Sequence, residues 1–263
     1  MEESGEKLNL GRLKDRVAII TGAARGIGKA TACKMTREGA AVVLADLLAE
    51  EVAAVSDELN SSGGRALGVV VDVSNKADVD KMVNLAMNDF GMVDILVNNA
   101  GQGHVSPLEG VKEDDWDRVV KVNLQGSLFC TQAVLPLMKE KRWGKIVNVS
   151  SRSSLGILDR TVYGATKAGL IGMTRIWSLE LASHNINVNC VAPGPIATEH
   201  FKRFNPETSE RTKSLLKSIP LQRMGEPEDV ANLISFLSSD EAAWITGQTI
   251  FICGGLTVGL VHY

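Results

Sequence analysis

Short apolar runs alternate with longer amphipathic segments along most of the chain. The apolar runs in the first hundred residues predict buried strands. They lie at residues 16–21, 41–45, 66–71 and 93–97. The segments that follow the first three runs show a helical spacing of apolar residues. These predicted helices end near residue 38 and span 49–60 and 75–90, with Gly39 and Gly91 placed to end the first and the third.

The second half of the chain continues this alternation. Further strands are predicted at 145–149, 186–191 and 249–253, and helices at 114–141 (in two stretches), 161–183 and 227–237. Residues 195–220 lack a clear period. Continuous apolar strands separated by helices are typical of a parallel sheet that is covered on both faces. We therefore predict an α/β fold with a single Rossmann-type, doubly wound parallel sheet of about seven strands.

Length and composition agree with one domain. The 263 residues are 44% hydrophobic, which is enough for one large core, and no internal repeat or linker interrupts the pattern. Residues 1–12 are mostly polar and predict a flexible tail ahead of a domain spanning 13–263. The N-terminus lacks the apolar stretch of a secretory signal, and no run reaches the roughly 18 residues of a membrane span. We expect a cytoplasmic protein without a membrane partner.

The charge balance and the cysteine spacing argue against two other classes. The chain has 28 basic and 31 acidic residues, a net charge of -3 and no basic stripe, so we expect no nucleic-acid partner. Its four cysteines are far apart in sequence, and its four histidines show no ligand spacing. We therefore expect neither a disulfide framework nor a metal site.

Three glycines, Gly22, Gly26 and Gly28, lie between the first predicted strand and the helix after it. Glycine permits a tight turn and the close approach of a ligand to the backbone. A helix N-terminus then offers free N–H groups to a diphosphate. The spacing differs from the commoner dinucleotide fingerprint, and such turns also occur for structural reasons alone. Its place at the start of a strand–helix–strand unit nevertheless favours a cofactor site.

An aspartate ends the second predicted strand. Asp46 lies eighteen residues after Gly28, where an acid can hydrogen-bond the ribose hydroxyls of NAD and repel the 2′-phosphate of NADP. Arg25 argues the other way, because an arginine in the phosphate loop could pair with that 2′-phosphate. A carboxylate on the ribose should outweigh an arginine that can turn to solvent. We predict NAD as the cofactor and leave NADP open as a secondary one.

Polar residues also follow the third and fourth strands. Asp72 and Val73 come after the third strand, and the run Asn98-Asn99-Ala100-Gly101 ends the fourth. Ligands of open α/β sheets bind along the carboxyl ends of the strands. Either segment could equally be an ordinary turn, because Asp, Asn and Gly favour turns.

Tyr163 and Lys167 lie four residues apart in a predicted helix, so their side chains leave the same face. Phenols are weak acids with a pKa of about 10, and a nearby ammonium group stabilises the phenolate. Such a pair can form a proton donor or acceptor tuned for catalysis. On its own, this spacing is more often a half-buried aromatic beside a solvated lysine.

Together these motifs resemble the short-chain dehydrogenase/reductase family, in the branch with TGxxxGIG and YxxxK motifs. The resemblance covers about residues 12–258. Its motifs occur in order as Thr21-Gly22…Gly26-Ile27-Gly28, Asp72-Val73, Asn98-Asn99-Ala100-Gly101, Lys121-Val122-Asn123, Ser150-Ser151, Tyr163-x-x-x-Lys167, Pro193-Gly194, Gly225-Glu-Pro-Glu-Asp-Val230 and Ile245-Thr-Gly-Gln248. It implies a nicotinamide-dependent oxidoreductase that acts on CH–OH groups.

The resemblance implies four catalytic residues, Asn123, Ser151, Tyr163 and Lys167. The tyrosine is the general acid/base on the substrate oxygen, and a serine hydrogen-bonds the same oxygen. The lysine supports the phenolate and holds the nicotinamide ribose, and the asparagine helps to hold a proton-carrying water chain. The family usually places its serine thirteen residues before the tyrosine, which by count is Ser150. By motif it is the second serine, so we predict Ser151 and one residue deleted from the loop that follows.

The resemblance further implies that the segment after the sixth strand contacts the nicotinamide carboxamide through Ile196 and Thr198. The predicted cofactor-binding residues are Gly22, Arg25, Gly26, Ile27, Gly28, Asp46, Asp72, Val73, Asn99, Ala100, Gly101, Tyr163, Lys167, Pro193, Gly194, Ile196 and Thr198.

Residues 195–220 predict a mobile lid over the substrate, as long loops near sites often are. The candidate substrate contacts are His104, Arg152, Leu158, His200 and Phe201. Basic side chains here, Arg152 and Arg160 among them, could meet a carboxylate or a phosphate, although most charges in such loops are simply solvated.

We predict an NAD-dependent enzyme that interconverts a secondary alcohol and a ketone as its small-molecule substrates. The main alternative is an NADPH-dependent reductase of 3-oxoacyl thioesters, and a second is a sugar-acid or polyol dehydrogenase similar to gluconate 5-dehydrogenases. A dinucleotide-sensing regulator on the same fold would be expected to lack catalytic residues that are all present here. The resemblance implies a homotetramer, with interfaces on the helices near 112–142 and 161–183 and on the last strand and tail.

Overall fold

The computed structural model describes residues 11–206 and 208–259. Strands and helices alternate through this part of the chain as predicted. The strands are β1 (Val17–Thr21), β2 (Ala41–Asp46), β3 (Arg65–Val70), β4 (Ile95–Asn98), β5 (Gly144–Val149), β6 (Ile186–Pro193) and β7 (Thr249–Ile252). The α-helices are α1 (Gly26–Arg37), α2 (Ala49–Ser61), α3 (Lys76–Phe90), α4 (Glu113–Val120), α5 (Gly126–Lys141), α6 (Thr161–Leu181), α7 (Glu199–Phe204), α8 (Glu210–Ser218) and α9 (Pro227–Leu237).

The strands form one parallel sheet in the order β3-β2-β1-β4-β5-β6-β7. The chain leaves β1 towards β2 and β3 and then returns to β4 on the other side of β1. This reversal creates the switch point at which open α/β sheets bind their ligands, outside the carboxyl ends of the strands. The predicted doubly wound fold is confirmed.

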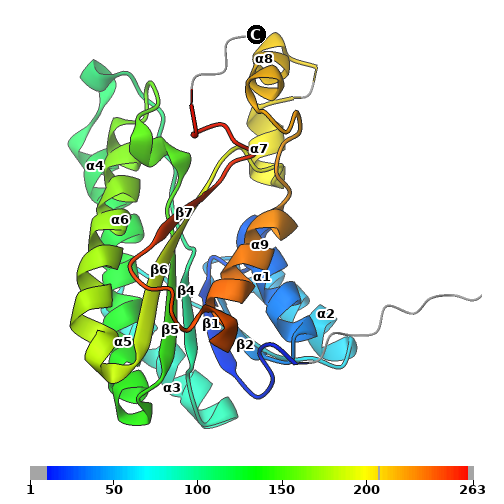
Figure 1. The fold of residues 1–263 in the computed structure, drawn as a ribbon, viewed down its shortest axis with the longest axis vertical. Helices are drawn as coiled ribbons and strands as arrows, with labels where there is room; N and C mark the ends of the chain where they lie inside the picture. Colours follow the sequence, from blue (N-terminus) through cyan, green and yellow to red (C-terminus); the bar gives the residue numbers. More distant parts are fainter. Residues whose placement is uncertain (1–10, 207, 260–263) are drawn as a thin grey trace, which may run out of the picture.

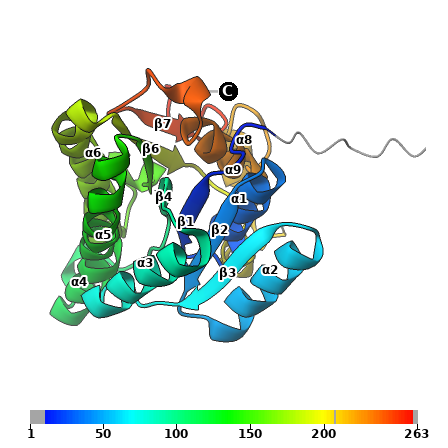
Figure 2. The same cartoon turned by 90° about the horizontal axis from the view of Figure 1, so that it is seen from below.

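Helices cover both faces of the sheet (Figures 1 and 2). Helices α1, α2 and α9 enclose one apolar core, and α3, α5 and α6 enclose the other. Every residue of the inner strand β1 is buried. Burial from both sides explains why the sequence of β1 carries no polar alternation.

Helix ends follow the local chemistry that the sequence indicates. Gly39 follows α1 with φ +95, and Gly91 ends α3 in the left-handed region with φ +73. Only glycine adopts these angles without steric cost. Glu226 and Asp229 form a capping box at the start of α9. The predicted helix ends at the two glycines are confirmed.

Residues 195–220 are more regular than predicted, because α7 and α8 form there and project beyond the carboxyl ends of the strands (Figure 1). The sequence of α8 is mostly polar, so it shows no clear apolar period. The signals for these helices are their caps instead. The hydroxyl of Thr198 accepts a hydrogen bond from the Phe201 N–H, and that of Ser209 accepts one from the Thr212 N–H.

Two further boundaries differ from the prediction. The helices expected in 114–141 are joined by a π-helical turn, Lys121–Gln125, instead of a break. The predicted tail over residues 1–12 lies outside the described residues as far as residue 10, whereas Arg12 forms ion pairs with Glu38 and Glu241. Within residues 11–206 and 208–259, no helix combines the length and the apolar character that a membrane crossing requires.

Candidate active site

The glycine loop between β1 and α1 has no room for a side chain at its glycine positions. Gly22 and Gly26 adopt positive φ angles of +66 and +53. A Cβ at Gly28 would lie 2.0 Å from the Gly22 carbonyl oxygen. No side chain caps the N-terminus of α1, so its first N–H groups are free to bind a diphosphate. The loop therefore fits the diphosphate of a nicotinamide dinucleotide.

Asn99 and Thr21 tie the end of β4 to this loop. The Nδ2 of Asn99 donates to the carbonyl oxygens of Thr21 and Gly22 at 2.9 and 3.0 Å. The Thr21 hydroxyl accepts from the backbone N–H groups of Asn99 and Ala100, both at 3.0 Å. Two of the predicted cofactor segments are thus held together at the switch point. Thr21 was predicted as part of the glycine motif but not as a cofactor-site residue, although a polar residue at the end of a buried strand was a usable signal.

Asp46 ends β2 and faces the same loop. Its Oδ2 accepts a hydrogen bond from the Ala24 N–H at 3.0 Å, and its Oδ1 accepts one from the Leu48 N–H at 3.2 Å. The carboxylate is therefore fixed beside the N-terminus of α1, where an acid can bind ribose hydroxyls.

Arg25, the residue that argues for a 2′-phosphate, is paired elsewhere. Its guanidinium forms a two-point ion pair with Glu51 in the first turn of α2. Hydrogen bonding to Glu51 and its charge raise the pKa of the Arg25 guanidinium. Glu51 was not predicted as a site residue. Its only signal in the sequence is its place in the acidic first turn of α2, the helix that follows Asp46.

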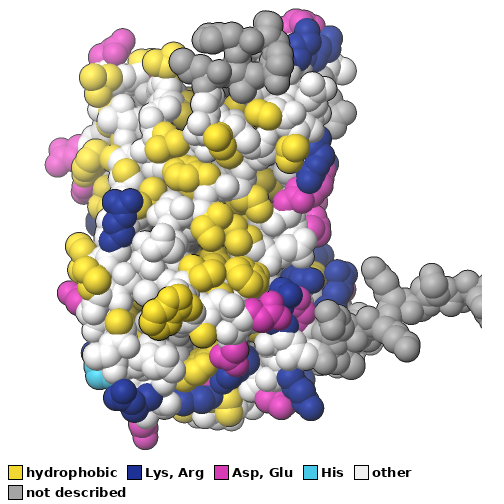
Figure 3. Space-filling model, in the orientation of Figure 1, with side chains coloured by type: hydrophobic (Ala, Val, Ile, Leu, Met, Phe, Trp, Pro, Cys, Tyr) yellow, Lys and Arg dark blue, Asp and Glu magenta, His cyan; other side chains and the backbone are white. Residues whose placement is uncertain are grey.

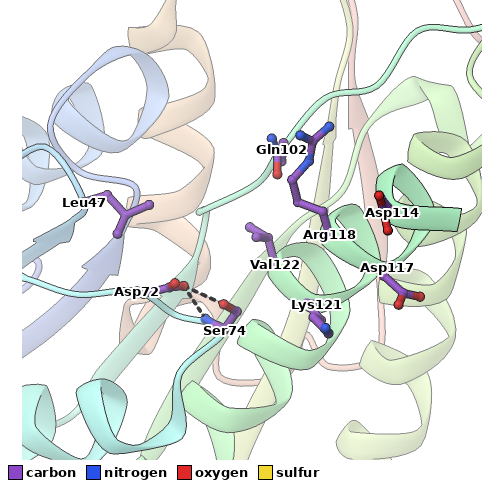
Figure 4. Close-up of a pocket in the computed structure, with 9 residues that line it drawn as sticks. All are labelled: Leu47, Asp72, Ser74, Gln102, Asp114, Asp117, Arg118, Lys121 and Val122. Atoms are coloured by element: carbon purple, nitrogen blue, oxygen red, sulfur yellow. Dashed lines mark hydrogen bonds between the residues drawn. The ribbon is translucent and has the colours of Figure 1, made fainter. Parts of the chain in front are cut away.

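A cleft of about 480 Å³ opens beside the ends of β2 and β3 (Figure 4). Leu47 and Asp72 line one side of it, and Val122 lies across from them. The Oδ1 of Asp72 accepts hydrogen bonds from the N–H and hydroxyl of Ser74, which leaves Oδ2 for a ligand. Val73 is buried, with its side chain packed on α5, so only its backbone can face a ligand. The two readings of this strand end, a turn and a ligand contact, are compatible.

Tyr163 and Lys167 lie one turn apart on α6, and the Lys167 Nζ is 5.6 Å from the centre of the Tyr163 ring. Lys167 is only 3% exposed, and its Nζ donates to the Val149 carbonyl oxygen at 2.7 Å. This bond to β5 fixes the ammonium group beside the phenol. On the other side, a Cβ at Gly101 would lie 3.2 Å from the Lys167 Nζ and 3.4 Å from the Asn123 Oδ1. Two of the predicted catalytic side chains therefore converge on Gly101.

Asn123 is fully buried in the π-helical turn. Its Oδ1 accepts from the Gln102 N–H at 2.7 Å, and its Nδ2 donates to the Gln102 carbonyl oxygen and the Thr166 hydroxyl at 3.1 and 2.9 Å. The amide thus joins the segment after β4 to α6. The π turn, an element often found at functional sites, places it there. Gln102 and Thr166 were missed from the sequence, because nothing in their types or spacing marks them.

The two adjacent serines after β5 have different environments. Ser150 is 3% exposed, and its hydroxyl donates to the Lys167 carbonyl oxygen at 2.6 Å. Ser151 is only partly buried, and its hydroxyl accepts from the Ser153 N–H at 3.1 Å. It also donates to the Ser153 hydroxyl at 3.3 Å, a long bond that a substrate oxygen can replace. The partial exposure of Ser151 and this weak bond favour it as the group that meets a substrate oxygen.

We expect Ser151→Ala to lower the rate of catalysis and Ser150→Ala to lower the stability of the fold. Loss of the Ser151 hydroxyl should lower kcat about 100-fold, because a donor to the reacting oxygen is removed. Loss of the Ser150 hydroxyl should instead lower the free energy of unfolding by about 1–3 kcal/mol, because it leaves the Lys167 carbonyl without that buried bond. Steady-state kinetics and urea unfolding of both variants distinguish these outcomes. The reverse pattern would assign the catalytic role to Ser150.

The segment after β6 closes the site opposite α6. A Cβ at Gly194 would lie 2.7 Å from the Cβ of Cys253, so this turn packs tightly against the end of β7. Ile196 is 6% exposed and joins the core. Thr198 approaches the glycine loop, since its Cγ2 would lie 3.1 Å from a Cβ at Gly26. The segment therefore borders the glycine loop, and its contact with a nicotinamide stays a prediction.

The predicted substrate contacts are spread over several segments. His104 is largely buried and turned towards α4, with its Nε2 3.5 Å from an α4 carboxylate. Leu158 is 90% exposed, and Arg152 is half-buried. Phe201 is half-buried in α7, whereas the side chain of His200 lies outside the described residues. The four whose side chains are described lie on different segments of the chain.

Comparison with known proteins identifies the family. A family model described as Enoyl-(Acyl carrier protein) reductase matches residues 22–257. The chain is 46% identical over 243 residues to the BbsD subunit of (2S)-[(R)-hydroxy(phenyl)methyl]succinyl-CoA dehydrogenase from Thauera aromatica, covering 92% of this chain and 97% of that one. It is 44% identical over 248 residues to a 3-oxoacyl-(acyl-carrier-protein) reductase from Thermotoga maritima, covering 94% and 100% of the two chains.

A solved structure agrees with these sequence matches. A variant of a Serratia marcescens short-chain dehydrogenase/reductase superimposes with a TM-score of 0.87 at 31% identity, covering 94% of this chain and 99% of that one. The fold, the order of the motifs and these relatives lead to one conclusion. The chain belongs to the short-chain dehydrogenase/reductase family and is an oxidoreductase that acts on CH–OH and keto groups.

Proposed function

We propose that the protein is an NAD-dependent dehydrogenase that oxidises a 3-hydroxyacyl thioester to the 3-oxoacyl thioester. The observation that carries the cofactor choice is the fixed Asp46 carboxylate together with the pairing of Arg25 to Glu51. The names of two relatives support the thioester, since one describes a CoA-linked hydroxyl compound and the other an oxoacyl group on a carrier protein.

The proposed mechanism assigns the proton to Tyr163. NAD, when bound, supplies the acceptor for the hydride of the carbinol carbon. The phenolate of Tyr163 takes the hydroxyl proton while Ser151 donates a hydrogen bond to the same oxygen. Lys167 has three N–H donors and uses one on Val149, so two are left for the ribose and the phenolate. Asn123 holds the wall of the site through its bonds to Gln102 and Thr166.

The electrostatics of the ribose end support NAD over NADP. A 2′-phosphate would carry negative charge towards Asp46, and like charges at short range repel. Arg25 could offset that repulsion only by leaving Glu51, which would give up a two-point charged hydrogen bond. The ribose hydroxyls of NAD carry no charge, so Asp46 does not repel them and Arg25 can stay paired with Glu51.

We expect Asp46→Ala to raise the NADP/NAD ratio of kcat/KM at least about tenfold, which corresponds to about 1.4 kcal/mol of lost discrimination. Adding Glu51→Ala should raise it again, because Arg25 is then free to meet the phosphate. Glu50→Ala is the matched control, since Glu50 is an exposed acid in the same turn. Initial rates with 3-hydroxyhexanoyl-CoA and each cofactor measure the ratios. Equal ratios in the wild type and in Asp46→Ala would remove Asp46 from cofactor recognition.

We also propose a homotetramer in the cytoplasm. Hydrophobic side chains gather across the middle of the face that carries β7 and α9 (Figure 3). Trp244 and Val258, on either side of β7 in sequence, are 100% and 87% exposed, and Ile176 and Leu179 are exposed on α6. Large exposed apolar side chains in such numbers fit contacts between copies of the chain. The four free cysteines fit a reducing compartment.

A further inference from the structure

Two arginines lie close to the proposed catalytic tyrosine. The guanidinium carbon of Arg160 is 5.8 Å from the centre of the Tyr163 ring. Arg152 directly follows Ser151 and begins the 3₁₀ helix Arg152–Leu155. Arg160 also lines a cleft of about 290 Å³ with residues of that short helix and of the first turns of α6. Arg160 therefore lies beside Tyr163, and Arg152, next to Ser151 in sequence, is near enough for its charge to interact with that of Arg160.

Neither arginine has an acidic partner in the described part of the chain, where no carboxylate oxygen lies within 4.0 Å of either guanidinium. Arg16 is also half-buried, and its guanidinium contacts both Asp94 and Asp240. Arg152 and Arg160 are buried to a similar degree but lack such carboxylate contacts.

The two charges also oppose each other. Burial lowers the pKa of the Arg152 guanidinium; Cys253 acts to raise this pKa, and the charge of Arg160 acts to lower it. Arginine stays protonated under these conditions, so the pair remains doubly positive. Holding two cations together in a partly dehydrated place costs free energy unless an anion joins them.

The backbone fixes Arg160 in this position. The Ser106 N–H donates to the Asp159 carbonyl oxygen at 2.9 Å, and Ser106 and Arg160 form an isolated parallel bridge. Arg160 is also the residue before α6, a helix of 21 residues whose N-terminus has no side-chain cap. The uncapped N–H groups and the helix dipole favour an anion at the same point.

We propose that Arg152 and Arg160 bind a free carboxylate on the acyl group, so that the preferred substrate is a 3-hydroxyacyl thioester of a dicarboxylic acid. This inference rests on the proposed function. Planar guanidinium groups match a carboxylate by paired hydrogen bonds. The short distance from Arg160 to Tyr163 places that carboxylate a few bonds from the carbinol carbon. The phosphates of coenzyme A lie a whole pantetheine arm beyond the thioester, so they do not fit this position.

The test compares two CoA esters of equal chain length. 3-Hydroxyadipyl-CoA ends in a carboxylate, and 3-hydroxyhexanoyl-CoA ends in a methyl group. We expect the wild type to favour the first at least tenfold in kcat/KM with NAD. Arg160→Met and Arg152→Met should each lower kcat/KM for the carboxylated ester about 10- to 100-fold, the range for a charged hydrogen bond. Both variants should stay within about threefold of the wild type for the neutral ester, a result that a merely structural role would not give.

Arg37→Met is the matched control, since it removes the same charge from an exposed position at the end of α1 and should change neither rate. The carboxylate site is wrong, and the proposed function stands, if the wild type oxidises both esters equally well or the two variants slow both esters alike. If the wild type oxidises neither ester while it oxidises other secondary alcohols, the proposed function fails and the carboxylate site fails with it.

Discussion

Tyr163→Phe should lower kcat by about 10²- to 10⁴-fold, the range for loss of a general acid/base. The substitution removes only the phenol oxygen and keeps the ring that packs beside Lys167. Binding of NADH should therefore stay within about twofold of the wild type, because the glycine loop and Asp46 are untouched. Stopped-flow or steady-state rates with 3-hydroxyhexanoyl-CoA, together with NADH fluorescence titration, measure both quantities.

Tyr163 faces no competing phenol in the sequence, because Tyr263 is the only other tyrosine. A variant that keeps a high rate would show that another group takes the proton.

Gly28→Ala should weaken NADH binding more than about tenfold, a loss of about 1.4 kcal/mol or more. The new Cβ would lie 2.0 Å from the Gly22 carbonyl oxygen and 2.8 Å from the Asn99 Nδ2. Neither neighbour is the free end of a flexible side chain, because Asn99 is held by Thr21 and Gly22. The loop must therefore open, which separates the N–H groups that would bind the diphosphate. Overpacking should also cost about 1–3 kcal/mol of stability.

Gly11→Ala separates the loss of binding from a general effect of adding a methyl group. Gly11 is exposed in the turn ahead of β1, and a Cβ there meets nothing within 4 Å. Alanine should change the stability by less than about 1 kcal/mol and leave NADH affinity unchanged. Isothermal titration with NADH and thermal unfolding of the two variants give the comparison. A folded Gly28→Ala protein with wild-type affinity would contradict the assignment of the loop to the diphosphate.

The strand and helix order followed from the sequence because both faces of the sheet are covered. The apolar runs at β1 and β2 need no partner residue to be recognised, since continuous burial leaves no polar positions in them. Likewise, the end of α3 at Gly91 could be predicted, because it depends on local chain geometry alone. Periodicity failed at α8, where short length and polar composition leave the Ser209 cap as the main signal.

The site was only partly predictable, because its details depend on residues distant in sequence. The sequence did not show whether Arg25 is available to a 2′-phosphate, because its partner Glu51 lies 26 positions further along. Ser150 and Ser151 look alike in the sequence, and the bond from Ser150 to the Lys167 carbonyl distinguishes them. The role of the Asn123 side chain likewise depends on Gln102, which no motif marks.

The most direct test measures kcat/KM of the wild type for 3-hydroxyhexanoyl-CoA with NAD and with NADP as the varied cofactors. We predict formation of the 3-oxoacyl ester with both, and at least about a tenfold higher value with NAD, because Asp46 is fixed beside the glycine loop and Arg25 is paired with Glu51. Equal or higher efficiency with NADP, or no oxidation of this ester or of 3-hydroxyadipyl-CoA with either cofactor, would contradict the proposed function.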